Sequence, residues 1–367
     1  LNISYAKADY NEKALEKSRF IAEIETYDAI QTKQVSLSDE TMIEFMLNVL
    51  QNEKPDIQNN LFDNELVDEI LLKYSLSVTH LNNYLKCPTA FYFNNLIRVP
   101  TPLNSSMAFG SAVHYALEIL FRKMNEHPDK KFGSVIDFMS YFKWYMKRLE
   151  ESFTEIEFKR RMEYGEKILP NYYETYINQW NKITSIERTY RNVIMEGVPL
   201  NGKLDKIEFI GNMVNVIDYK TGQFEKAKGK FNPPDLEKVE LKQVENKKIK
   251  HEDKHGGDYW RQAVFYKILI DNDKNSKWQI QKVEFDFVEP DQNTGRYIKQ
   301  AVNITPDDVE IVRNQIKDTY NKIKAKEFEN GCKEEDCVWC NFVDTYYKNK
   351  TVPNINLQSA EDYEEVN

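Results

Sequence analysis

The segment Gly202-Lys-Leu-Asp-Lys-Ile-Glu-Phe-Ile-Gly-Asn-Met-Val-Asn-Val-Ile-Asp-Tyr-Lys-Thr-Gly222 holds the clearest structural signal in this chain. Its residues alternate as in β-strands, and Gly211-Asn212 predicts a two-residue hairpin turn between two strands. In that register Asp205 faces Asp218, with their β-carbons roughly 4.5–5.5 Å apart. Lys220 lies on the same face, because side chains alternate along a strand. The hairpin therefore brings two carboxylates and an ammonium group together.

The paired carboxylates suggest a cation site. Two carboxylates this close, partly removed from water, either share a proton or bind a cation. With oxygen ligands and a lysine alongside, the expected ion is Mg²⁺ or Mn²⁺. The alternative is a solvated cross-strand pair bridged by Lys203 or Lys206, and the hairpin alone leaves both interpretations open.

Two helical patterns carry further polar residues. His114 lies on the apolar face of a predicted helix, where it is either a metal ligand or a hydrogen-bonded core residue. Glu118 follows at i+4, and pairing with Arg122 is favoured for it over metal ligation. Gln262 and Tyr266 share another helix face at i, i+4, and an amide and a phenol beside a metal site are suited to bind a phosphate or a base.

The remaining periodicity surrounds the hairpin with helices. Residues 185–220 are expected to form consecutive strands, and a further strand pair is hinged on 291–295. Residues 223–258 are charged and show no periodicity. Helices before and after a mixed sheet predict an α/β or α+β core; those helices are expected near 110–124, as a pair within 134–183, near 259–270 and near 306–324.

The overall charge argues against a nucleic-acid partner, but only as an average. The 367 residues include 50 basic and 59 acidic side chains, for a net charge of −9. Residues 226–250 nevertheless hold eight lysines against four acidic residues. This local excess of positive charge could bind a phosphate backbone. A solvated charged loop is the commoner explanation for such a run. No apolar run approaches the ~18 residues of a membrane-spanning helix. No secretory signal is visible, so we expect a cytoplasmic protein without a membrane partner.

The cysteines predict a metal centre. Four cysteines are too few for a secreted disulfide scaffold of this length. Three of them, Cys332, Cys337 and Cys340, lie within nine residues. Such crowding indicates metal binding in a reducing compartment.

Taken in chain order, these motifs resemble the nuclease module of the PD-(D/E)XK superfamily, in its RecB-like branch. That branch carries GxxxH on a helix, a strand aspartate, DxK and QxxxY. The resemblance covers about residues 75–345 and implies a restriction-endonuclease-like core, in which helices flank a mixed β-sheet. The matching residues are Gly110 to His114, Asp205, Asp218-Tyr219-Lys220 and Gln262 to Tyr266.

The resemblance implies catalytic roles for the first three motifs. His114, Asp205, Asp218 and the carbonyl of Tyr219 would hold Mg²⁺ or Mn²⁺. Lys220 would act with the two aspartates by orienting a water molecule or stabilising the phosphate. The implied reaction is phosphodiester hydrolysis that leaves 5′-phosphate and 3′-hydroxyl ends.

The resemblance also extends to the cysteines. In AddB-type members, one cysteine upstream of the core and three downstream bind a [4Fe–4S] cluster. Cys87 matches the upstream ligand and Cys337-x-x-Cys340 matches the downstream pair. The usual last position is Tyr346 here, so Cys332 would substitute for it. Four thiolates also suit Zn²⁺, which is the alternative to the favoured iron–sulfur cluster.

The N-terminal residues resemble the closing segment of superfamily 1 helicases. The match comprises Leu1–Ala6 and Ser18–Ile24. It suggests that residues 1–75 are a helicase-like remnant or linker. The nuclease domain would then span 76–345, with the charged insertion at 223–258, and an acidic tail would occupy 346–367.

The expected protein is a metal-dependent DNA exonuclease. It would be the nuclease module of an AddAB/RecB-like ATP-dependent helicase–nuclease in double-strand-break repair, with DNA and a helicase domain or subunit as partners. Gln262 and Tyr266 would contact the substrate strand. The alternatives are a stand-alone nuclease of CRISPR adaptation and a nuclease-dead subunit that binds DNA or acts as a scaffold.

Overall fold

The structure is a computed structural model that describes residues 65–345 and five isolated residues before them, Ile21, Ile24, Ser38, Ile43 and Phe62. Contacts divide the chain into residues 1–59 and 60–367, and the description below concerns the second unit. The expected helicase-like segment 1–75 lies largely outside the described residues. The expected acidic tail 346–367 lies entirely outside them.

Five strands form one mixed sheet in the order β1–β2–β3–β4–β5. β3 and β4 pair in parallel, and the other neighbours pair antiparallel. A parallel pair needs a long crossover, and the chain between these strands contains α12 (Asp258–Asn272). This arrangement confirms the predicted mixed sheet flanked by helices; the strands are β1 (Thr184–Met195), β2 (Val198–Ile210), β3 (Met213–Lys220), β4 (Gln279–Phe287) and β5 (Lys299–Val302).

The β2–β3 hairpin has the predicted register. Ile210 pairs with Met213 across the turn, and Lys206 pairs with Ile217. Gly211 has a φ of +62°, which suits the tight turn because glycine adopts positive φ without a steric penalty. The paired ladder ends at Lys206, so Asp205 and the residues opposite it lie just beyond regular pairing.

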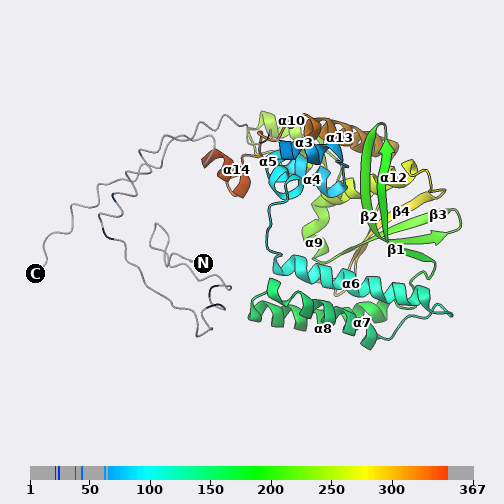
Figure 1. The fold of residues 1–367 in the computed structure, drawn as a ribbon. Helices are drawn as coiled ribbons and strands as arrows, with labels where there is room; N and C mark the ends of the chain where they lie inside the picture. The colour runs from blue at the N-terminus through cyan, green and yellow to red at the C-terminus, as the bar shows by residue number, and fades with distance from the viewer. Residues whose placement is uncertain are drawn as a thin grey trace, which may run out of the picture. The chain divides into compact units, whose positions relative to one another are not determined.

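Helices cover both faces of the sheet (Figure 1). Successive residues of β3 point to opposite faces, so Val216 packs in the core shared with α12, whereas Ile217 packs in the core shared with α6. Asp218 has the parity of Val216 and therefore faces α12. The helices on the α6 side are α6 (Ser105–Glu126), α7 (Val135–Arg148) and α8 (Glu155–Tyr176); on the other side are α4 (Val78–Lys86), α12 and α13 (Pro306–Lys324).

The charged insertion has more structure than its sequence indicated. It folds into α9 (Phe224–Ala227), a 3₁₀ turn, α10 (Leu236–Val244) and α11 (His251–His255). Asp253 connects α11 to α10, because it accepts from Lys238 and Lys242, each over 2.6 Å. α10 buries only Val239, so it packs little apolar surface against the rest of the protein.

Short helices from both ends of the second unit pack into the same core as α12. They are α3 (Glu65–Leu72), α5 (Pro88–Phe91), the π-helical turn Tyr92–Leu96 and α14 (Val338–Val343). Phe93 stacks on Trp339 with ring centroids 4.3 Å apart, which joins α14 to the segment after α5. Within residues 65–345, no helix combines the length and the apolar character that crossing a membrane requires.

Candidate active site

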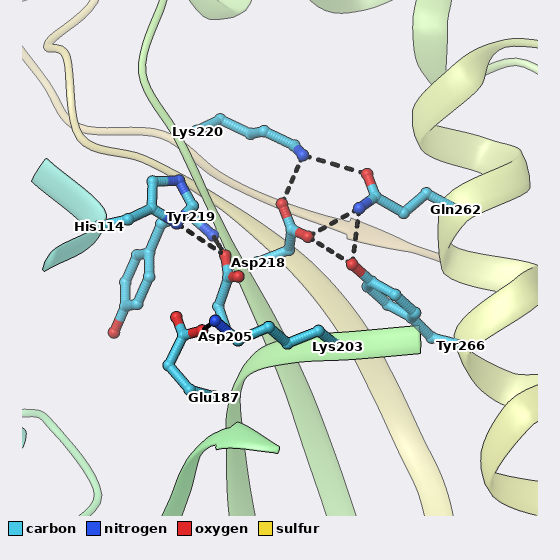
Figure 2. A network of polar contacts seen from close by, with 9 residues as sticks. All are labelled: His114, Glu187, Lys203, Asp205, Asp218, Tyr219, Lys220, Gln262 and Tyr266. Carbon is cyan, nitrogen blue, oxygen red and sulfur yellow. Dashed lines mark hydrogen bonds and ion pairs between the residues drawn. The ribbon is translucent and has the colours of Figure 1, made fainter. Parts of the chain in front are cut away.

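Side chains from α6 and the end of the β2–β3 hairpin meet at Asp205 (Figure 2). The Nδ1 atom of His114 lies 3.3 Å from Asp205 Oδ2. The same oxygen accepts a hydrogen bond from the backbone N–H of Tyr219 over 2.9 Å. Gly110, one turn before His114, lets α6 approach the sheet, because a β-carbon there would lie 2.9 Å from Thr221 Oγ1. The GxxxH pattern thus has a packing reason as well as a chemical one.

Asp218 is held by three side chains (Figure 2). Its Oδ1 accepts from Gln262 Nε2 over 2.9 Å and from the Tyr266 hydroxyl over 2.8 Å. Its Oδ2 lies 2.5 Å from Lys220 Nζ, which also donates to Gln262 Oε1 over 3.1 Å. The i, i+4 pair on α12 therefore fixes the carboxylate and the ammonium group together.

The lysines weighed as bridges between the two aspartates have other partners. Lys203 pairs with Glu187 on β1 (Figure 2). Lys206 is fully buried and pairs with Glu208 over 3.0 Å. A solvated aspartate pair bridged by either lysine is therefore not what the chain forms.

Glu187 is a candidate site residue that the sequence analysis missed. His114, Glu187 and Asp205 each offer a ligand atom, and these atoms all lie within 4.8 Å of one another. Glu187 lies on β1 between Ile186, which pairs with Lys206, and Arg188, which pairs with Leu204. That register sets Glu187 across from Asp205. The only available sequence signal was an acid on the strand that precedes the hairpin.

Burial and charge together set the ionisation of the site. Burial lowers the pKa of His114, but its contact with Asp205 outweighs this and holds that pKa above its ordinary value. Burial acts against ionisation of Asp205, yet the contact with His114 keeps its pKa below the ordinary range. Burial raises the pKa of Asp218 in spite of the neighbouring Lys220. The pKa of Lys220 is lowered by burial but raised more by Asp218, so it stays an ammonium group.

The donor set fits a divalent cation. An imidazole nitrogen and two carboxylates converge, and oxygen-rich sets of this kind suit Mg²⁺ or Mn²⁺. Asp218 and the carbonyl of Tyr219, predicted as further ligands, belong to the adjoining β3 strand. Glu118, the weaker alternative, pairs with Arg122 as expected.

The four cysteines form a second cluster. Cys87 Sγ lies 3.5 Å from Cys340 Sγ and 3.9 Å from Cys337 Sγ. Cys332 Sγ lies 3.9 Å from Cys340 Sγ, and all four sulfurs fall within 4.8 Å of one another. None of the four is in a disulfide. Cys332 therefore lies in one cluster with the other three cysteines, and Tyr346 lies outside the described residues.

Comparison with known proteins identifies the family of the chain. The profile of the PD-(D/E)XK nuclease superfamily matches residues 75–345. No curated protein matches the chain. Among solved structures, the crystal structure of SSO0001 is similar at 14% identity and a TM-score of 0.26, over 69% of this chain and 83% of that chain, which is too low to add evidence on the fold. Because the matched region holds the five-stranded sheet and both side-chain clusters, the chain belongs to the PD-(D/E)XK nuclease superfamily.

Proposed function

We propose that the chain is a divalent-metal-dependent DNA exonuclease. It acts as the nuclease module of an AddAB/RecB-like ATP-dependent helicase–nuclease in double-strand-break repair. The observation that carries the proposal is the convergence of His114 and Asp205 with Asp218 and Lys220 at the end of one hairpin. A subunit that had lost its nuclease activity would have no need to keep this set assembled.

The metal ligands in this proposal are His114, Asp205, Asp218 and the carbonyl of Tyr219, and Glu187 is added from the geometry. When held by these residues, Mg²⁺ or Mn²⁺ would supply Lewis-acid chemistry, which would lower the pKa of the attacking water and offset charge on the scissile phosphate. The protein's part is to hold these ligands rigidly. The backbone N–H of Tyr219 fixes one carboxylate, and α12 fixes the other.

Lys220 serves as an electrostatic group in this reaction. The ion pair with Asp218 holds the pKa of Lys220 above the ordinary lysine value, which favours its ammonium form. Its ammonium group is anchored between Asp218 and Gln262. From there it stabilises negative charge that develops on the phosphate. Gln262 and Tyr266 set its position and meet the substrate strand.

The cysteine cluster is proposed to hold a [4Fe–4S] cluster, with Zn²⁺ as the alternative. Its role is to join Cys87, near the start of the nuclease region, to the three cysteines at its end. The sulfur of Cys87 also accepts from the backbone N–H groups of Ala90 and Cys332, each over 3.3 Å. These hydrogen bonds stabilise a thiolate ligand. They suit a cluster that holds the start and the end of the nuclease region together rather than one that takes part in catalysis.

The exonuclease assignment is tested by comparing DNA that has strand ends with DNA that has none. With Mn²⁺, the chain should release nucleotides from linear DNA and leave a covalently closed circle of the same sequence intact. Equal degradation of both forms would show an endonuclease. Degradation of neither form, under conditions where the protein is folded and metal-loaded, would overturn the proposed activity.

A further inference from the structure

Three stacked rings lie on α6 and α7, and of these Trp144 is exposed while Tyr115 and Tyr145 are partly buried. Tyr115 on α6 stacks on Tyr145 of α7, with centroids 4.4 Å apart and planes at 28°. Tyr115 also stacks on Trp144, at 5.3 Å and 27°. Trp144 is 52% exposed, although it is among the largest apolar side chains in the chain. We call Tyr115, Trp144 and Tyr145 the aromatic platform.

Packing between helices accounts for Tyr145, which lies against the core, but not for Trp144. The buried side chains of α7 are Phe138, Phe142 and Met146, which recur every four residues on one face. Trp144 lies two positions from Phe142, which is about 200° around the helix and therefore on the face turned from the core. Burying an indole contributes to stability only when water is removed from it, so the fold alone gives no reason for a tryptophan here.

Cations lie on the same surface. The Arg148 guanidinium sits 5.4 Å from the centre of the Trp144 ring. Lys123 Nζ lies 4.8 Å from the centre of the Tyr141 ring, one turn along α7 from the platform. Among the residues that the structure describes, neither cation forms an ion pair with a carboxylate. Aromatic rings interleaved with unpaired cations are typical of surfaces that bind single-stranded nucleic acid.

The platform adjoins the metal-binding residues through α6. Tyr115 directly follows His114, so the two side chains leave the helix about 100° apart. The His114 side chain is 33% exposed, which opens the site to solvent at this point. A strand whose phosphate reached His114 and Asp205 would therefore bring its neighbouring bases to the rings.

We propose that the aromatic platform binds bases of a single-stranded stretch of the DNA substrate. Bases stack on Trp144 and Tyr115, and Arg148 and Lys123 meet the flanking phosphates. The inference rests on the proposed nuclease function and adds to it a surface on α6 and α7 that binds bases of the substrate strand. Stacking favours no particular sequence, since every base has a flat face.

The test compares binding of two oligonucleotides without divalent metal, so that no strand is cut. One is a fluorescein-labelled oligothymidylate, and the other is an abasic strand with the same number of phosphates. Trp144→Leu should weaken oligothymidylate binding by about 5- to 100-fold, the effect of losing one stacked base. Trp144→Phe should keep most of the affinity. Ile136→Ala, at another exposed apolar position on α7, should change nothing.

The abasic strand separates stacking from a structural defect. The abasic strand should bind more weakly than oligothymidylate, because it has no bases to stack. Its affinity should be the same for the wild-type chain and for Trp144→Leu. Unchanged oligothymidylate binding by Trp144→Leu, or an equal loss for both strands, would overturn the platform. If the wild-type chain still degrades linear DNA after either of these outcomes, the proposed function stands and only the aromatic platform is overturned. A wild-type chain that neither binds nor cuts DNA would overturn both.

Discussion

Glu187 of β1 lies across from Asp205 of β2 because a bulge shifts the strand register between them. Near the turn, Met195 pairs with Val198 and Val193 pairs with Leu200. Beyond the irregularity between Tyr190 and Val193 the pairing has moved by one residue. Counting from the turn without the bulge would set Glu187 against Lys206, on the opposite face. The one inserted residue therefore places a third potential metal ligand, the Glu187 carboxylate, beside His114 and Asp205.

Replacing Glu187 by Gln should weaken metal binding. The amide keeps the shape of the side chain but removes a negative charge from the group formed with His114 and Asp205. Mn²⁺ affinity, measured by isothermal titration calorimetry, should fall by about 10- to 100-fold. The calorimetric readout does not depend on catalysis.

Glu208→Gln is the matched control for that change. Glu208 lies on β2 but pairs with the buried Lys206, away from the donor group. Its substitution should leave Mn²⁺ affinity unchanged. Equal affinities of wild type and Glu187→Gln would exclude Glu187 as a ligand.

Gln262→Leu should slow catalysis more than it weakens DNA binding. The amide bonds to both Asp218 and Lys220, and its loss frees both groups to move. A displacement of about 1 Å in a reacting group costs about 100-fold in rate. Single-turnover cleavage should show this loss, while Gln243→Leu, an exposed glutamine on α10, should behave as wild type. If the variant instead needs a higher DNA concentration to reach half of an unchanged maximal rate, Gln262 serves substrate binding alone.

Local patterns were enough to predict much of the fold and part of the site. The turn at Gly211 fixed the β2–β3 register, because a two-residue hairpin leaves no freedom in the count. The i, i+4 spacing of Gln262 and Tyr266 placed both side chains on one face, and both contact Asp218.

Features that depend on tertiary contacts could not be predicted. The bulge that carries Glu187 to Asp205 lies at Arg191 and Asn192, where Asn192 has a φ of +51°. A single asparagine within a strand pattern does not by itself predict a bulge. The helices of the insertion are held by ion pairs of Asp253 rather than by an apolar face. A sequence pattern based on hydrophobic spacing therefore missed them.

Gly331→Ala should damage the cysteine cluster. A β-carbon at this position would lie 2.2 Å from Cys340 Sγ and 3.0 Å from Thr89 Oγ1, so the sulfur must move. We expect less bound metal per chain by elemental analysis. Gly229→Ala, where the added carbon meets nothing within 4 Å, is the control and should keep its metal. Full metal occupancy in Gly331→Ala would mean that the sulfurs adopt a different arrangement when metal is bound.

Cys87→Ser should remove the metal and lower the melting temperature. Cys87 is the one ligand that lies some 250 residues before its partners, so its loss opens the longest loop that the cluster closes. Purified without oxygen, the wild-type chain should be brown, and the variant should be colourless and melt several degrees lower. One zinc per chain and no iron in the wild-type protein would replace the iron–sulfur assignment with a zinc site.

Asp218→Asn tests the central claim most directly, because Asp218 joins the metal-binding hairpin to Lys220 and α12. The measurement is Mn²⁺- or Mg²⁺-dependent degradation of linear DNA, followed beside DNA binding by the same preparations. We predict a loss of at least about 100-fold in the cleavage rate with DNA binding retained. Cleavage by Asp218→Asn at the wild-type rate would contradict the assigned site.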